Sequence, residues 1–363
     1  MDALEPQLGG IGRYTWELCK GLERRSDIED LRFYARNSLI SDPALLLSAQ
    51  YRHPPSRRWP FASLQRRRLE RILGSHLVHG PNYFLPDGVE RGVITAHDLS
   101  VFRFPETHPA ERVRQFEQKF QSSVDRSAHV ITDTETVRRE LIDDFGLQPD
   151  RVTAVLLGVE SKFRPRTAED VQPQLSALGL QAGSYALCVS TLEPRKKIAE
   201  LLTAWEALPR SLRDRVPLVL AGGAGWRNES LREAVDRGVA QGWLKHLGFV
   251  DEAAMPALYA GARLFIYPSI YEGFGLPPLE AMASGVQAMV SNRSCLPEVG
   301  GDAALYIDPD DILAFTRAIE EALDDENGRQ TCVQRGLARA AEFTWARCIE
   351  GTVGVYRTAL AQG

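Results

Sequence analysis

The sequence contains few cysteines, and they form no pattern. The thiols are far apart along the chain, and none belongs to a CxxC motif or to a Cys/His cluster. An odd and scattered set excludes a disulfide framework and a cysteine-ligated zinc site, so we expect reduced thiols. The cysteines are Cys19, Cys188, Cys295, Cys332 and Cys348.

Long hydrophobic runs are also missing. No stretch of roughly 18 apolar residues runs without a charge or a turn, and the first residues, MDALEPQLGG, lack the basic and apolar segments of a secretory signal. We therefore expect a cytoplasmic protein that is neither exported nor membrane-spanning. Repeats of solenoid period and low-complexity tracts are absent too, which excludes repeat and fibrous architectures.

What is present is the composition of a globular enzyme-sized chain. The 363 residues are 44% hydrophobic and 25% charged, with a mean hydropathy of −0.23, as in soluble folded proteins. The length exceeds that of one ordinary hydrophobic core, so we expect two domains.

The net charge of −5 is mildly acidic and gives no reason to expect a nucleic acid partner. The first half of the chain is nevertheless the more basic, mainly because of an arginine run at 52–72, RHPPSRRWPFASLQRRRLERI. This run could contact anionic lipid headgroups or a lipid-linked phosphate at the inner face of the cell membrane. It could equally be a solvated loop and helix face.

Short apolar runs rich in β-branched residues alternate with longer stretches of helical period, such as HLVHG, VITAHDL and HVITDT in the first half and YALCVST, PLVLAGG and RLFIYPS in the second. This alternation predicts parallel α/β sheets. The polar, proline-containing stretch 160–174 separates the two series and is predicted to be a hinge. The sequence thus predicts two doubly wound, Rossmann-like domains facing a cleft.

Four unusual loops follow predicted strands: HDLS after 93–96, EPRKK after 185–191, GGAGW after 217–221 and SIYEGFG after 264–268. In open α/β sheets the loops at the carboxyl ends of the strands gather at one edge, where ligands bind. We therefore expect all four loops to face the cleft.

Two of the motifs suggest contact with an anion. Arg195, Lys196 and Lys197 stand where a strand gives way to a helix, and cations at a helix start oppose the helix dipole. At least one of them is therefore expected to serve a diphosphate, although one could be an ordinary surface cation. The glycine loop GGIGRY, residues 9–14, could bring backbone N–H groups to a phosphate, but it could also be a simple turn, and it lacks the full dinucleotide fingerprint.

The stretch YEGFGLPPLEA places Glu272 in a loop and Glu280 within the helix that the proline pair begins. Gly273 and Gly275 allow close backbone approach, and the N–H groups at the helix start suit phosphate. Carboxylates accept hydrogen bonds from hydroxyls, so this layout fits a ligand with hydroxyls at both ends and phosphates between. A nucleotide sugar has that layout.

These residues resemble those of retaining glycosyltransferases of family 4, which have the two-domain GT-B fold. The resemblance runs almost from end to end and is carried by GGIGRYTWEL, HDLSVFRFPETHP, TLEPRKKI, LAGGAGW, YPSIYEGFGLPPLEAMASG and SNRSCLPEVGGDAALYIDPDD. It implies an acceptor-side domain at 1–165, a nucleotide-sugar-binding domain at 166–344 and a helix at 345–363 that crosses back to the first domain. Only MDALEPQL precedes the glycine loop, where the family has a strand, so either the true start lies upstream or that strand is missing.

The resemblance also implies roles for single residues. Glu272 would hold the donor sugar, and Glu280 would hold the ribose hydroxyls. Arg195 and Lys196 would neutralise the departing diphosphate, and His97 of HDL would line the sugar site from the first domain. The backbone near the donor phosphate or the acceptor would come from Gly10, Gly12, Gly273, Phe274, Gly275 and Leu276. One departure is Lys197, where the family usually has Asn.

HDLSVFRFPE and TLEPRKK are most similar to bacterial mannosyltransferases of O-antigen and exopolysaccharide assembly. This likeness implies a donor such as GDP-mannose, or a related GDP-rhamnose, and an acceptor glycan on undecaprenyl diphosphate. The expected reaction is metal-independent and needs no cofactor, and transfer would proceed with retention. The alternatives are another donor such as a UDP-sugar, an epimerase or phosphorylase of the same fold, and an inactive nucleotide-binding partner in a polysaccharide assembly complex.

Overall fold

The computed structural model describes residues 1, 3–51, 62–223 and 229–362, with side chains from residue 67 onward in the helix that begins at Ala62. The chain divides into two compact units. Unit 1 comprises residues 1–99, 110–158 and 345–363, and unit 2 comprises residues 100–109 and 159–344. The chain thus starts and ends in unit 1 and contributes two segments, 100–109 and 159–344, to unit 2. The domain boundaries and domain roles expected from the sequence stay predictions.

Unit 1 contains a four-stranded parallel sheet of order β3-β4-β5-β6 and a short antiparallel pair, β1 with β2. Its strands are β1 (Phe33–Ala35), β2 (Ser38–Ile40), β3 (Val78–Gly80), β4 (Gly92–Ala96), β5 (Ser127–Thr132) and β6 (Val152–Ala154). Its helices are α1 (Gly10–Glu23), η1 (Pro43–Leu47), α2 (Ala62–Ser75), α4 (Ala110–Asp125), α5 (Glu135–Phe145), η3 (Pro149–Arg151) and α15 (Trp345–Ala361).

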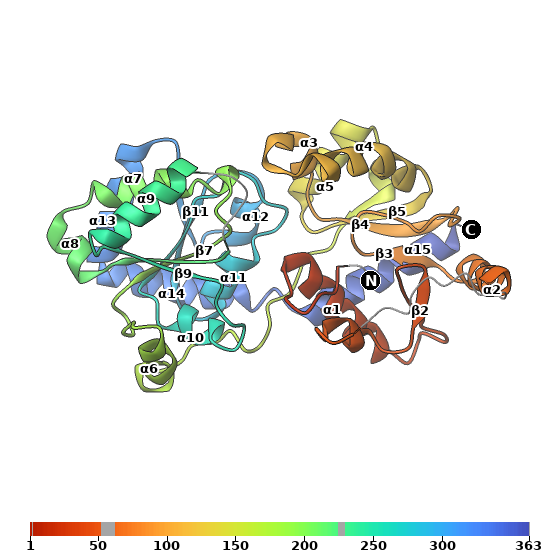
Figure 1. The fold of residues 1–363 in the computed structure, drawn as a ribbon, viewed down its shortest axis with the longest axis horizontal. Helices are drawn as coiled ribbons and strands as arrows, with labels where there is room; N and C mark the ends of the chain where they lie inside the picture. The colour runs from red at the N-terminus through yellow and green to blue at the C-terminus, as the bar shows by residue number, and fades with distance from the viewer. Residues whose placement is uncertain (2, 52–61, 224–228, 363) are drawn as a thin grey trace. The chain divides into compact units, whose positions relative to one another are not determined.

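Helices cover both faces of this sheet. In Figure 1, α4 and α5 lie on one face of β4 and β5, while α1 and α15 pack together on the other. All five residues of β4 are buried, as expected for a parallel strand covered on both sides.

Unit 2 has a six-stranded parallel sheet of order β12-β11-β10-β7-β8-β9. Its strands are β7 (Ala186–Val189), β8 (Leu218–Ala221), β9 (Leu244–Gly248), β10 (Leu264–Tyr267), β11 (Gln287–Ser291) and β12 (Leu305–Ile307). Its helices are α3 (Ser100–Arg103), η2 (Pro105–Thr107), α6 (Ala168–Ala177), η4 (Pro194–Lys196), α7 (Ile198–Glu206), α8 (Arg210–Arg215), α9 (Glu229–Ala240), α10 (Met255–Ala260), α11 (Leu276–Ala283), α12 (Leu296–Gly300), α13 (Ile312–Asp324) and α14 (Glu326–Ala340).

The helices of unit 2 also form two layers. α7, α9 and α13 pack on one face, and α10, α11 and α14 lie on the other (Figure 1). The first layer and the sheet share one apolar core, which includes the fully buried residues Trp205, Phe315 and Leu264. The predicted alternation of parallel strands and helices is therefore confirmed in both units.

The predicted hinge at 160–174 is wrong in its second half. α6 begins at Ala168, and Thr167 and Asp170 form a capping box in which each side chain accepts a backbone N–H of the other residue. This reciprocal cap stabilises a helix start within a stretch whose polar composition is typical of a linker. Pro173 lies inside this helix, where it removes one intrahelical N–H donor.

Candidate functional site

The order of strands in unit 2 reverses between β7 and β10, and this marks a special position in the sheet. From β7 the chain runs outward through β8 and β9, then returns to the other side of β7 and continues through β10, β11 and β12. The loops that follow the neighbouring strands β7 and β10 therefore depart in opposite directions. In open α/β sheets this topological switch point is where ligands bind. Two of the four predicted loops, EPRKK and SIYEGFG, lie there.

The loop after β7 sets two cations against one carboxylate. Lys196 is 7% exposed, forms an ion pair with Glu272, and donates to the Tyr267 hydroxyl at 3.0 Å. Arg195 lies 3.4 Å from the second oxygen of Glu272 and 3.1 Å from Glu193. The neighbouring loops are thereby joined around Glu272.

Backbone contacts reinforce this junction. The Ile270 N–H donates to the Arg195 carbonyl at 2.9 Å, and the Arg195 guanidinium donates to the Tyr271 carbonyl at 2.9 Å. The Ser269 hydroxyl lies 3.3 Å from each of these two carbonyl oxygens. The ring of Phe104 packs against Tyr271 with ring centroids 5.3 Å apart.

The cations control the charge of Glu272. Burial alone would raise the pKa of this carboxyl, but the charges of Lys196 and Arg195 and the hydrogen bonds to it outweigh burial and lower the pKa to about 2. Glu272 is therefore ionised at neutral pH and able to accept hydrogen bonds.

Lys197 differs from its two neighbours. It lies in the left-handed region with φ of 53° and pairs with Glu200 at 2.7 Å and Asp310 at 2.9 Å. All three cations thus have carboxylate partners within the chain. These internal carboxylates balance the charge of the cations, so the helix dipole alone gives no reason for an external anion, and the contact of a cation with a diphosphate stays a prediction.

The loop after β10 leads into α11 as the sequence predicts. Gly275, at φ of 101°, precedes the helix, and a side chain there would meet Leu296 at 2.9 Å. α11 starts at Leu276, and the proline pair comes directly after this residue in the first turn of the helix. Glu280 is buried within the same helix. Phe274 is buried against Phe343, with centroids 5.8 Å apart.

Sequence reasoning missed two residues that hold this loop. The Ser294 hydroxyl accepts the backbone N–H of Glu272 at 3.2 Å and donates to its carbonyl at 2.8 Å. The Cys295 thiol lies 3.1 Å from the same carbonyl and 3.2 Å from that of Phe274. Both residues stand in SNRSCL, but serine and cysteine have no spacing signal that could show their partner.

In unit 1 the glycine motif is not a loop before a helix. Gly10 and Gly12 lie in the first turn of α1, and a side chain at Gly12 would meet the Ala3 carbonyl at 2.8 Å and Leu8 at 3.0 Å. The absence of a side chain at Gly12 therefore lets the preceding segment pack closely. The segment GGIGRY was misread as a loop because glycine disfavours helices in general.

His97 follows β4 and is 5% exposed. Its Nδ1 lies 2.8 Å from Asp133 and its Nε2 lies 2.9 Å from the Pro81 carbonyl, so both ring nitrogens face oxygen atoms that can accept a hydrogen bond. Burial lowers the pKa of His97, but the charge and hydrogen bond of Asp133 outweigh it and raise the pKa. Asp133 is a third residue that the sequence did not indicate, although it follows β5 at the same sheet edge.

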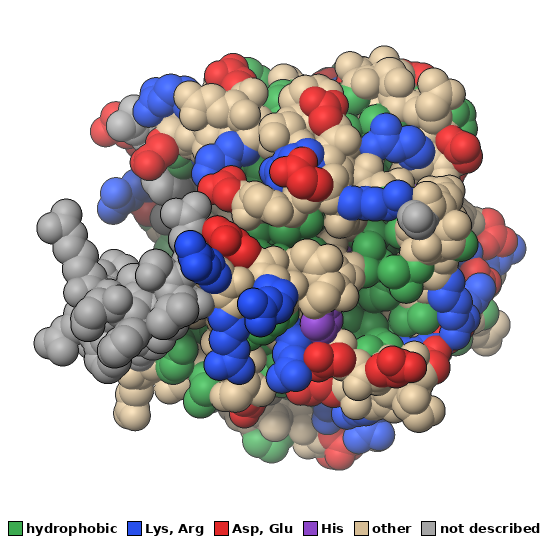
Figure 2. All heavy atoms as spheres, turned by 90° about the vertical axis from the view of Figure 1, so that its right-hand side faces the viewer, with side chains coloured by type: hydrophobic (Ala, Val, Ile, Leu, Met, Phe, Trp, Pro, Cys, Tyr) green, Lys and Arg blue, Asp and Glu red, His purple; other side chains and the backbone are tan. Residues whose placement is uncertain are grey.

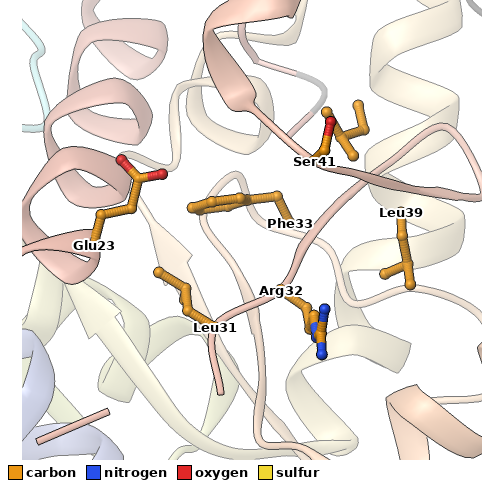
Figure 3. A pocket seen from close by; sticks show the side chains of 7 residues that line it. Glu23, Leu31, Arg32, Phe33, Leu39 and Ser41 are labelled. Atoms are coloured by element: carbon orange, nitrogen blue, oxygen red, sulfur yellow. The ribbon is translucent and has the colours of Figure 1, made fainter. Parts of the chain in front are cut away.

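The predicted residues fall into two sets: Gly10, Gly12 and His97 lie in unit 1, and Arg195, Lys196, Glu272, Gly273, Phe274, Gly275, Leu276 and Glu280 lie in unit 2. A pocket of about 500 Å³ beside the β1-β2 pair contains none of them. Figure 3 shows its lining, with the Phe33 ring pointing toward Glu23. Within the described ranges, no group of three His, Cys, Asp or Glu side chains could hold a metal ion.

Comparison with known proteins identifies the two halves of the chain. Residues 8–163 match the family described as Glycosyltransferase Family 4, and residues 179–339 match Glycosyl transferases group 1. The O-antigen chain mannosyltransferase B of Escherichia coli is 37% identical to this chain over 98% of both sequences.

Solved structures share the fold. A sucrose-phosphate synthase from Thermosynechococcus elongatus superposes with a TM-score of 0.70 over 100% of this chain and 98% of its own, at 19% identity. The Anabaena protein HepE, in complex with UDP and glucose, gives a TM-score of 0.66 over 82% and 84%, at 18% identity. The predicted GT-B fold is confirmed. The chain is a glycosyltransferase and belongs to glycosyltransferase family 4.

Proposed function

We propose that this glycosyltransferase moves a mannosyl unit from GDP-mannose onto a lipid-linked glycan, with retention at the anomeric carbon. The observation that carries the proposal is the placement of Arg195, Lys196 and Glu272 at the switch point of unit 2. The buried Lys196 and the partly buried Arg195 beside an ionised carboxylate match the charges of a sugar diphosphate, because the cations suit phosphate and the carboxylate suits sugar hydroxyls.

In this proposal the protein's main contribution to the reaction is electrostatic. The bond between the anomeric carbon and the diphosphate breaks, and negative charge grows on the leaving group. Arg195 and Lys196 stabilise that charge, and they are held in place before the reaction by Glu193, Glu272 and the Tyr267 hydroxyl. Preorganised charges in a site shielded from water give the largest single contribution in many enzymes.

The sugar identity draws support from the O-antigen relative, which is named as a mannosyltransferase. The nucleotide is less constrained, because HepE has been solved with UDP and glucose. UDP-sugars and GDP-rhamnose are therefore the competing donors. Glu280, buried in α11, is proposed to bind the ribose hydroxyls, which every nucleotide shares, so it gives no preference among bases.

The proposed acceptor is a glycan on undecaprenyl diphosphate at the cytoplasmic membrane face. In α2, the described side chains of Arg67, Arg68 and Arg71 are all exposed and free to meet an anionic surface. Arg52, Arg57 and Arg58 of the same run lie outside the described residues. Figure 2 shows Lys and Arg interspersed with Asp and Glu on the face that it presents. None of the helices in the described ranges has the length and apolarity needed to cross a membrane.

A titration with nucleotides and a stereochemical assay test the proposal. Calorimetry in EDTA compares GDP, UDP and ADP with their sugar conjugates, and selective binding of GDP-mannose is expected. NMR of the product then follows the new anomeric bond, for which retention is expected. Preference for UDP-glucose would overturn the GDP-mannose assignment, an inverted product would overturn retention, and binding without transfer to lipid-linked glycans would favour an inactive assembly partner.

A further inference from the structure

We propose that Ser294 and Cys295 are positioning residues that set the place of Glu272 for recognition of the donor sugar. The inference rests on the proposed function, in which Glu272 binds sugar hydroxyls. It concerns the loop after β11, whose residues SNRSCL carry part of the family resemblance but were given no role in the predicted site.

The first observation is the pairing of one hydroxyl with both backbone groups of one residue. Ser294 Oγ accepts the Glu272 N–H at 3.2 Å and donates to the Glu272 carbonyl at 2.8 Å. Two bonds to the same residue fix both the position and the orientation of its backbone. The Cys295 thiol, 0% exposed, adds a donor 3.1 Å from that carbonyl and 3.2 Å from the Phe274 carbonyl.

The second observation is the backbone of Ser294 itself. Its φ of 57° lies in the left-handed region, which disfavours a residue with a side chain. Glycine would adopt this conformation without steric cost. The chain therefore keeps a side chain where stability alone favours glycine, and the hydroxyl of that side chain contacts Glu272. Strain retained next to a functional residue is typical of a site in which geometry matters.

The third observation is that the side chain and the backbone of Glu272 are held by two different loops. Its side chain meets Lys196 and Arg195, which come from the loop after β7, while its backbone is held from the loop after β11. Three loops thus converge on one carboxylate. A shift of the backbone would move the carboxylate away from the sugar even if the ion pairs persisted, because the side chain can rotate to follow the cations.

Two variants with opposite effects on stability separate positioning from simple structural support. Ser294→Gly and Ser294→Ala both remove the hydroxyl, but only alanine keeps the steric cost of the left-handed backbone. We expect both to lower kcat/KM for GDP-mannose by about tenfold or more, mainly through KM. Affinity for GDP alone should stay within about twofold, because Glu272 is proposed to contact the sugar. If activity instead followed stability, with glycine active and alanine impaired, the inference would be wrong.

Cys295 offers a rescue experiment. Cys295→Ala removes the donor and is expected to weaken GDP-mannose binding, whereas Cys295→Ser keeps a donor at the same position and should restore it. Cys348→Ala is the matched control, because Cys348 is also a buried thiol but lies in α15 of unit 1. Equal activity of the alanine and serine variants at position 295 would overturn the role of the thiol.

A readout that needs no donor keeps this inference separate from the proposed function. Hydrogen exchange of the Glu272 amide should speed up by about tenfold or more in Ser294→Gly, since its acceptor is gone. Ser291→Ala is the control, because Ser291 Oγ accepts the Arg293 N–H at 3.2 Å in the same loop. Faster exchange without activity on any donor in the parent enzyme would contradict only the function, and unchanged exchange would contradict the inference.

Discussion

Glu272 in unit 2 and Asp133 in unit 1 are both buried carboxylates paired with a cation near the carboxyl edge of a parallel sheet, yet their pKa values shift in opposite directions. Burial raises the pKa of Asp133 despite the opposing charge of His97. For Glu272, burial is outweighed by two cations and the pKa falls to about 2. Asp133 Oδ1 has no hydrogen-bond partner within the described part of the chain. At such an edge, the number of cations and donors around a buried carboxylate thus decides whether its pKa rises or falls.

The largest expected effect comes from removing Lys196. Lys196→Ala leaves Glu272 with Arg195 alone in a buried site, and breaking a buried pair in this way typically costs about 3–5 kcal/mol of unfolding free energy. Loss of a charge that stabilises the leaving group should also lower kcat by about 10²–10³-fold. Denaturant unfolding and donor turnover measure the two effects.

A second variant separates stability from catalysis in this test. The double variant Lys196→Ala with Glu272→Gln removes the uncompensated charge, so it should unfold less easily than Lys196→Ala but remain inactive. Lys197→Ala, in which only partly exposed ion pairs are lost, should change stability by no more than about 1 kcal/mol and keep activity. Full activity of Lys196→Ala would refute the role proposed for this lysine.

Acid unfolding tests whether the pKa of Glu272 is lowered in the folded protein. The pKa of Glu272 is lowered from 4.5 to about 2, so its contribution to stability is present above pH 4.5 and is lost as the pH falls toward 2. The size of that contribution is on the order of 3 kcal/mol. Unfolding curves of the parent and of Glu272→Gln should therefore converge as pH falls through this window. Parallel curves would mean that Glu272 titrates normally.

A variant of Asp133 tests the carboxylate whose pKa is raised rather than lowered. Because Asp133 raises the pKa of His97, Asp133→Asn should lower that pKa. A raised histidine pKa stabilises the fold at low pH and loses this effect as pH rises through the folded-state pKa, so the variant should lose about 1–3 kcal/mol chiefly in acid. NMR titration of the His97 ring checks the shift, and an unchanged pKa would show that Asp133 does not stabilise the charged ring.

The sequence predicts the strands and the two carboxylate positions well for an identifiable reason. Parallel strands buried on both faces read as short apolar runs, as β4 does at residues 92–96. The proline pair after Leu276 sets the start of α11, which places Glu272 and Glu280 correctly. Local chemistry fixes these features, so local patterns show them.

The contacts that complete the site were not predictable in the same way. Tyr267 reaches Lys196 across 71 positions, and Ser294 reaches Glu272 across 22. Their meeting depends on the strand order at the switch point, which is a tertiary property. The misread glycine segment has the same origin, because the packing of Ala3 and Leu8 on Gly12 overrides the low helix propensity of glycine.

The smallest expected effect concerns Lys197, next to the buried lysine but on partly exposed surface. Its φ of 53° favours Asn over Lys, and its pairs with Glu200 and Asp310 are partly exposed to water and therefore weak. In Lys197→Asn the relief of backbone strain and the loss of two ion pairs oppose each other, so the unfolding free energy should change by less than about 1 kcal/mol. Unfolding in low and high salt checks the balance, since only the ion-pair part weakens with salt. Asp310 also pairs with Arg293 at 2.7 Å and so links the loops after β7 and β11. A loss of several kcal/mol of unfolding free energy would show that this link is as strong as the one through Glu272. Lys196 and Lys197 would then not differ in their importance for stability.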